Sequence, residues 1–208
     1  MTVSTLAGQP GVSGWSPDGP PGSSILNQPW ALAAGPASGP MPVDIFWTEA
    51  GNGIVRRYNG ITVSTFAGTP RGFGMVNGPA LSSKFASVGP QGIAFFGNDM
   101  FVVDTNNYVI RKLDSSTGLI STYAGIVGQY SPMSNGPIAS ATFNQPAGIT
   151  IGQTGQIYIA DWGNSVIRLL AGGQASTVAG TNTAGFNDGL SSSSQFNRPQ
   201  VWNIIKCR

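Results

Sequence analysis

A six-residue phrase that the chain repeats four times constrains its fold more than any other feature. The copies read VSTLAG, VSTFAG, ISTYAG and ASTVAG, and they begin at Val3, Val63, Ile120 and Ala175. They recur roughly every 55 to 60 residues, and self-similarity at a fixed period indicates one supersecondary unit that stacks on copies of itself. Most motifs in such a chain are therefore expected to be structural before they are functional.

The composition favours short strands joined by turns. Of the 208 residues, 30 are glycine and 15 are proline, and only 9% are charged, far below the roughly 25% of an average soluble protein. A flexible linker can share this glycine and proline content, but it lacks regularly spaced apolar segments such as those found here. An all-β fold with many short strands fits better.

The second repeat shows the unit most clearly. Four β-rich runs, at residues 93–96, 100–104, 108–113 and 119–123, are separated by Gly, Asn, Asp and Ser residues. Such runs are typical of antiparallel hairpins. Four strands per unit, repeated radially, predict the blades of a β-propeller. The first run is wholly apolar, as expected for an inner strand that is buried on both faces.

A block with a fixed spacing of an acid, an asparagine and an arginine lies between the second and third runs of each unit. Its members are Glu49, Asn52 and Arg56, then Asp104, Asn107 and Arg111, and then Asp161, Asn164 and Arg168. The segment 157–168 closely resembles the NHL repeat, in which a strand ending in Ala-Asp precedes an x-x-Asn-x-x-Ile-Arg block, and 101–111 is similar. The resemblance covers essentially the whole chain and implies a propeller of NHL type with four-stranded antiparallel blades.

The repeats also predict how the chain is divided. A strand at 2–7 is expected to close a preceding blade, full blades are expected at about 26–67, 86–124 and 144–179, and 196–206 is expected to begin a further blade. Propellers close into rings of roughly 4 to 8 blades, so an incomplete ring is predicted here. The chain is then a fragment of a longer propeller, which we favour, half of a composite ring with a second chain, or an arc capped by a partner.

The three repeated acids suggest a metal site, because acidic residues near the axis bind a divalent cation in some propeller lactonases and lyases. Since Glu49, Asp104 and Asp161 occupy equivalent turns, we expect hydrogen bonds to turn amides and ion pairs with the arginine of each block instead. The chain has no histidine, which excludes imidazole ligands and histidine-based catalytic pairs. We therefore expect no enzyme and no cofactor. The alternative is a lactonase-type hydrolase or lyase whose axial metal is held partly by further blades.

One aromatic residue recurs in the long loop before each Asp-Gly or Asn-Gly pair. These residues are Trp15, Phe73, Tyr130 and Phe186. A ring that packs on the blade below as a loop anchor is the simpler role, and contact with a protein or glycan partner is the functional one. The main hypothesis is a binding or structural module, a scaffold for protein–protein or glycan interaction that can self-associate in a larger assembly.

Nucleic-acid binding is a weaker alternative. The formal net charge is +2 and the basic residues form no run, whereas nucleic-acid binding usually needs a clustered basic patch. The cations available for such a patch are Arg56, Arg57, Arg71, Lys84, Arg111 and Lys112.

Little in the sequence points to a compartment. No apolar stretch approaches the roughly 18 residues of a membrane span, and no signal peptide or other targeting signal is visible. The single cysteine, Cys207, can form no intrachain disulfide. The Ser-Thr-x-Ala-Gly subtype resembles NHL arrays of many extracellular proteins, which favours the extracellular space or an organelle lumen.

Overall fold

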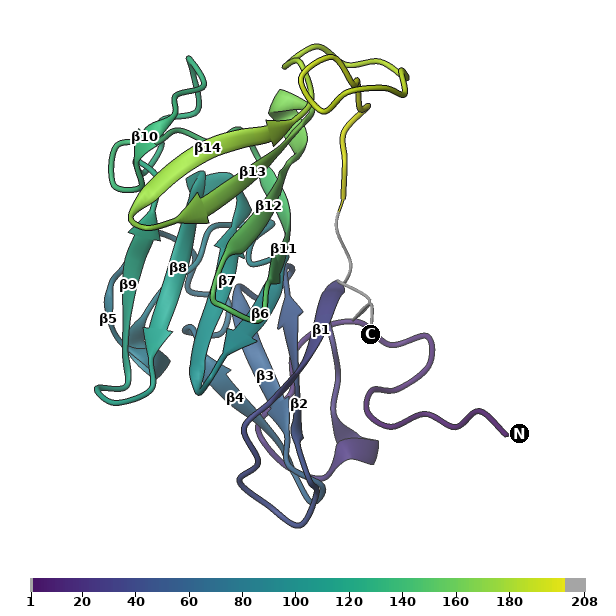
Figure 1. Ribbon diagram of the computed structural model, residues 1–208. Helices are drawn as coiled ribbons and strands as arrows, with labels where there is room; N and C mark the ends of the chain where they lie inside the picture. The colour runs from purple at the N-terminus through teal and green to yellow at the C-terminus, as the bar shows by residue number, and fades with distance from the viewer. Residues whose placement is uncertain (1, 201–208) are drawn as a thin grey trace.

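Three antiparallel β-sheets stand side by side in the computed structural model, which describes residues 2–200 (Figure 1). The first sheet contains β1 (Pro29–Gly35), β2 (Asp44–Glu49), β3 (Ile54–Tyr58) and β4 (Val63–Ala67). The second contains β5 (Gly78–Pro79), β6 (Ile93–Phe96), β7 (Asp99–Asp104), β8 (Val109–Asp114) and β9 (Leu119–Ala124). The third contains β10 (Gly136–Pro137), β11 (Pro146–Ile151), β12 (Ile157–Asp161), β13 (Val166–Ala171) and β14 (Gln174–Ala179).

Each sheet is built around four consecutive strands that pair with their neighbours in chain order, as in a propeller blade. We call these units blades 1, 2 and 3. The predicted all-β class with four-stranded antiparallel blades is confirmed. The helical segments are single 3-10 turns, namely η1 (Pro21–Ser23), η2 (Ala80–Ser82), η3 (Thr105–Asn107) and η4 (Trp162–Asn164).

The cores lie between the blades. In β7, Met100 and Val102 pack toward blade 1, whereas Phe101 and Val103 pack toward blade 3. Successive residues of a strand point to opposite faces, so a strand between two neighbours needs apolar residues at every position. This explains the unbroken apolar runs of the sequence.

The Asn-Gly segments of blades 2 and 3 each begin a short additional strand. Gly78 and Pro79 form β5, which pairs with the outermost strand β9, and β10 pairs with β14 in the same way. In blade 1 the counterpart is a single bridge between Gly19 and Val63. The outer strand of a blade has an edge whose backbone N–H and C=O groups would otherwise lack partners. The short segment that pairs with this edge provides hydrogen bonds to part of it. Gly78 has φ of 129°, a conformation that other residues rarely adopt, so the glycine allows this pairing.

The two ends of the predicted array are not formed as expected within the described residues. Residues 2–7 form no strand, because no strand lies beside them for pairing between residues 2 and 200. Residues 196–200 also form no strand, and the rest of the predicted 196–206 segment lies outside the described residues. The loop from about 181 to 195, yellow in Figure 1, projects beyond the end of blade 3.

Candidate functional site

The repeated acid of blade 2 is fully occupied by its own turn. Asp104 ends β7, and its Oδ1 accepts a hydrogen bond from the backbone N–H of Ala86 at 2.9 Å. Its Oδ2 accepts from Asn107 Nδ2 at 2.8 Å and from Arg111 Nη1 at 2.9 Å. Asp104 is buried and Arg111 is only 1% exposed, so this is a buried ion pair with hydrogen-bonded partners.

Blade 3 repeats this arrangement. Asp161 accepts from the backbone N–H of Asn144 at 2.8 Å, from Asn164 Nδ2 at 2.8 Å and from Arg168 Nη1 at 3.3 Å. Burial raises the pKa of Asp161 and of Asp104, although the hydrogen bonds and the arginines act in the opposite direction. Burial also lowers the pKa of Arg168.

Each arginine also holds the long loop that approaches its blade. Arg111 Nη1 donates to the carbonyl of Lys84 at 3.1 Å, and Nη2 donates to the carbonyl of Val76 at 2.9 Å and to Asn77 Oδ1 at 2.8 Å. The guanidinium lies 5.4 Å from the centre of the Phe85 ring. The block therefore joins the turn, the loop and the hydrophobic core of one blade.

Blade 1 departs from the expected pairing. Between residues 2 and 200, no ion pair within 4.0 Å joins Glu49 to Arg56, so that part of the sequence prediction is wrong. The longer Glu49 side chain accepts from Trp47 Nε1 at 3.0 Å and from Asn52 Nδ2 at 2.6 Å. Asp18 occupies the repeat position of an asparagine in the other blades, and its Oδ1 lies 3.8 Å from Arg56 Nη2. In blade 1, the acid that pairs with the arginine therefore comes from the loop that contains Asp18, whereas in blades 2 and 3 it comes from the block itself.

Two of the four loop aromatics lie on the turns that carry these blocks. The ring of Tyr130 packs on that of Tyr108, with centroids 5.2 Å apart. Phe73 lies over Gly53, where an added Cβ would come within 3.0 Å of the Phe73 ring. Phe73 nevertheless stays 43% exposed and Tyr130 50% exposed. Each ring is therefore anchored on its blade and also presented to solvent.

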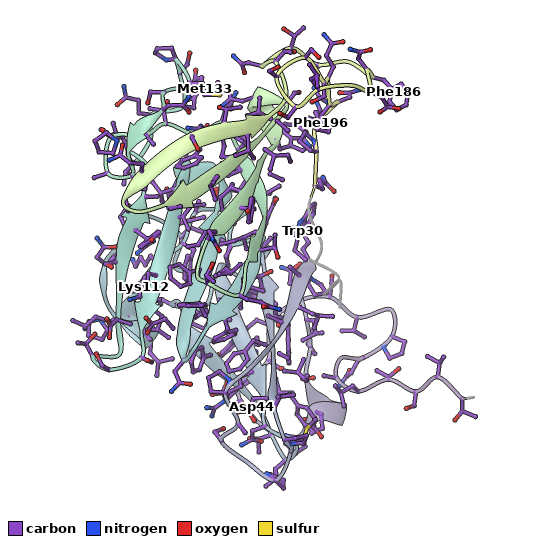
Figure 2. The ribbon with its side chains drawn as sticks, viewed as in Figure 1. Trp30, Asp44, Lys112, Met133, Phe186 and Phe196 are labelled. Carbon is purple, nitrogen blue, oxygen red and sulfur yellow. The ribbon has the colours of Figure 1, made fainter. Side chains whose placement is uncertain are left out.

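The other two aromatics lie differently. Phe186 is 91% exposed, and Figure 2 shows it on the outlying loop, away from the sheets. Trp15 is half-buried, and its indole N–H has no hydrogen-bond partner within residues 2–200. The four equivalent positions therefore do not form one uniform row.

A hollow that the sequence prediction missed lies where the inner strands of the three blades come together. It has a volume of about 160 Å³. Three of its residues, Trp30, Gln91 and Ala147, occupy the same repeat position, two residues before Leu32, Ile93 and Ile149. The other lining residues are Val88, Thr105, Asn106, Gln145, Trp162 and Gln200. We call this the axial pocket, and Trp30 is marked in Figure 2.

The chemistry of the axial pocket is neutral. None of its lining side chains is ionisable in the normal pH range, and two indoles and several amides surround the space. The guanidinium of Arg198 lies 4.6 Å from the Trp162 ring centre. A comparison that looks for identical residues in each repeat does not find these positions, because their residues differ from blade to blade. That difference is itself the sequence signal that marks them.

Several of the six candidate cations are buried or paired with acids. Arg56 and Arg111 are buried, and the Lys112 ammonium lies 2.7 Å from an Asp99 oxygen and 3.6 Å from Asp114. Among residues 2–200, no group of three acid, histidine or cysteine side chains is placed to hold a metal ion. In the same range, no helix is long and apolar enough to cross a membrane.

Together the blades and the axial pocket define a protein of the β-propeller class. The sequence profile of the NHL repeat matches residues 143–168. NHL repeat-containing protein 2 of Bos taurus is 34% identical over 101 residues, which cover 47% of this chain and 14% of that protein. These matches support the NHL-repeat family, so the resemblance seen in the sequence is confirmed.

Two further relatives are similar over parts of the chain. Protein SUPPRESSOR OF QUENCHING 1, chloroplastic, of Arabidopsis thaliana is 34% identical over 71 residues, covering 34% of this chain and 6% of that protein. An auxiliary nutrient binding protein of Bacteroides thetaiotaomicron has a similar structure, with a TM-score of 0.57 and 21% identity over 78% of this chain and 40% of that one. The latter likeness shows the fold alone.

Proposed function

We propose that this chain is a non-enzymatic binding module, a rigid propeller scaffold that contacts a protein partner through its loop aromatics. The observation that carries the proposal is that Phe73 and Tyr130 are fixed by contacts with their turns and still half-exposed. A pre-positioned aromatic ring loses little conformational entropy when it is buried, and such rings dominate the binding energy of many interfaces.

Enzymatic activity is not part of the proposal. The buried carboxylates of Asp104 and Asp161 each accept three hydrogen bonds within their own blades, and Glu49 is bonded to Trp47 and Asn52. A general base or a metal ligand needs a free oxygen at the reacting centre. These contacts therefore favour a structural role over the lactonase-type alternative.

The test is quantitative capture of proteins by immobilised full-length chain from the cells that produce it. The wild type is compared with a variant carrying Phe73→Ser, Tyr130→Ser and Phe186→Ser. Phe96→Ser is the control, because Phe96 is a 46% exposed aromatic at the opposite end of its blade. We expect a partner that binds the wild type and the control and loses at least tenfold in affinity for the triple variant. Equal binding to all three proteins would contradict the proposal.

A neutral glycan in the axial pocket is the second candidate. The C–H face of a sugar packs on an indole, and its hydroxyl groups bond to side-chain amides such as those of Gln91 and Gln145. Titration calorimetry with neutral oligosaccharides would test this, with Trp162→Ala as the pocket variant and Phe96→Ser as the control. We expect binding that Trp162→Ala weakens at least tenfold, and no heat of binding from any sugar would exclude the candidate.

We also propose the extracellular space or an organelle lumen as the compartment. The support is the resemblance of the repeated phrase to extracellular NHL arrays. Fractionation of the native cells, with detection of the endogenous protein, would test it. Recovery of the protein in the cytosolic fraction would contradict it.

A further inference from the structure

The axial pocket is lined at one repeat position by residues of different chemistry. Trp30, Gln91 and Ala147 hold this position in blades 1 to 3, and Gln200 holds it in the repeat that begins after blade 3. Blade 3 forms with only a methyl group there, so the blade architecture does not require an amide at this position. The amide of Gln91 therefore calls for another explanation.

Two nearly buried polar side chains in the wall of the pocket have few or no partners. Thr105 is 4% exposed, and its Oγ1 has no hydrogen-bond partner among residues 2–200. Gln91 is 7% exposed, and its Nε2 donates a long hydrogen bond of 3.4 Å to the carbonyl of Val88. A buried hydroxyl or amide normally has well-placed partners, because a buried polar group without one costs stability. These two groups are the ones that a ligand in the pocket would satisfy.

The hydroxyl of Thr105 is the clearer of the two signals. At the same repeat position blade 1 has Ala50, which is buried, and blade 3 has Trp162, which also lines the pocket. The fold thus accepts an apolar side chain at this place. Rotation about the Cα–Cβ bond exchanges the methyl and hydroxyl groups of a threonine. The Thr105 hydroxyl can therefore turn to the pocket without breaking a hydrogen bond with residues 2–200.

The backbone beside the pocket is held in an uncommon conformation. Val88 and Gln145 both line the pocket, and their φ angles are 63° and 47°. A positive φ is uncommon for a residue other than glycine, and it is a genuine outlier for a β-branched side chain such as valine. Residues in such conformations cluster at ligand sites, where the surrounding structure holds them. The strain at Val88 therefore points to the same pocket as the polar groups of Thr105 and Gln91.

The size and charge of the pocket limit what can enter it. Its volume of about 160 Å³ is below the roughly 300–1,000 Å³ of pockets for drug-sized ligands, so it takes one ring rather than a chain of rings. Its neutral wall combines two indoles with hydroxyl and amide groups. A sugar ring has the matching chemistry, with C–H groups on its faces for an indole and hydroxyl groups around its edge.

We propose that the axial pocket binds one terminal, neutral sugar ring of a glycan, and that Thr105 and Gln91 select the sugar by bonding to its hydroxyl groups. This inference rests on the second candidate function, a neutral glycan in the axial pocket. The sugar ring packs on the Trp162 indole, and its edge meets the Thr105 hydroxyl and the Gln91 amide. A site built to bond a hydroxyl rejects an analogue that lacks it, because a buried polar group of the site is then left unpaired.

Titration calorimetry of the full chain with methyl glycosides of neutral hexoses and N-acetylhexosamines identifies the sugar. Thr105→Val is the main variant, since it keeps the shape of the side chain and replaces the hydroxyl by a methyl group. We expect it to weaken binding at least tenfold and to leave Tm unchanged or higher, because the lost hydroxyl has no partner among residues 2–200. Thr105→Ser restores a hydroxyl and should recover most of the affinity. Gln91→Met should weaken binding as Thr105→Val does.

Thr142→Val is the matched control. Thr142 is 3% exposed and does not line the axial pocket. Its Oγ1 accepts a hydrogen bond from the backbone N–H of Ser134 at 2.9 Å and donates one to the carbonyl of Pro132. The same substitution at this place should therefore lower Tm and leave sugar binding unchanged.

The outcomes separate this inference from the function on which it rests. If no glycoside or oligosaccharide binds the wild type, the glycan candidate fails and the inference fails with it. If a sugar binds the wild type and Thr105→Val equally well, the glycan candidate stands and the role of Thr105 is overturned. A clearly lower Tm for Thr105→Val would show that its hydroxyl stabilises the fold, which would also overturn that role. Equal affinity for the same sugar inside a chain and at its end would overturn the binding of a terminal ring.

Discussion

Replacement of Asp104 by asparagine is the most direct test of what stabilises the blades. The change keeps the size of the side chain but removes its charge and one acceptor oxygen. Asp104 Oδ2 accepts hydrogen bonds from both Asn107 and Arg111. An amide NH₂ group at that place would face the N–H groups of these two residues and could accept from neither. The guanidinium of Arg111, 1% exposed, would then lie buried without its counter-charge.

The expected effect is large. Removal of one partner from a buried, hydrogen-bonded ion pair typically costs about 3–5 kcal/mol in the free energy of unfolding. For a chain of this length, each kcal/mol lowers Tm by about 2–4 °C, so the expected loss is about 6–20 °C. Urea unfolding and thermal unfolding, both followed by circular dichroism, measure the two quantities.

Glu49→Gln in blade 1 is the matched comparison, because Glu49 is buried and hydrogen-bonded but has no arginine of the described part of the chain, residues 2–200, within ion-pair distance. Loss of one buried hydrogen bond there should cost about 1–3 kcal/mol. If Asp104→Asn costs no more than Glu49→Gln, the buried ion pair is not what stabilises the turn. The hydrogen bonds alone would then account for the repeated acid.

Three other predictions follow from particular contacts. Burial raises the pKa of Asp161, so the folded state keeps a proton to higher pH than the unfolded state, and this contribution to the unfolding free energy falls as the pH rises above the usual value of 3.8. Urea titrations over that pH range should show a steeper decline for the wild type than for Asp161→Asn, and parallel curves would refute the assignment. Gly92→Ala should cost about 1–3 kcal/mol in urea unfolding, because its Cβ would lie 2.7 Å from the carbonyl oxygen of Ala147 on the neighbouring blade, and an unchanged midpoint would refute this. A chelator should leave Tm unchanged, since the repeated acids are satisfied by protein donors, and a fall of several degrees would reveal a bound metal.

The strands could be predicted from the sequence because each is short, apolar and bounded by turn residues. The run 93–96 is β6 in the structure, and the run 119–123 lies within β9. Strand residues were recognisable because blades that pack on both sides need apolar residues at every position. Residues 2–7 have the same kind of sequence but form no strand, because a strand also depends on a partner that its own residues do not specify.

The partner of the arginine in each block could be predicted less well from the sequence. Glu49 replaces an aspartate and Asp18 replaces an asparagine, and each change alone appears conservative. Only the structure shows that they are related, since both carboxylates lie near the same buried arginine, Arg56. The two residues are far apart in the sequence, and no periodicity connects them.

The repeat separates positions that build the fold from positions that can bind. Arginines at the third position of the block are identical in all blades, and each is buried with its donors directed at its own loop. Trp30, Gln91 and Ala147 share a position but differ in size and in hydrogen-bonding capacity, and all three line the axial pocket. A position that must satisfy the same neighbours in each blade keeps its residue, whereas a position that faces a shared central space is free to differ. In this chain, a ligand site is therefore to be sought where the repeats disagree.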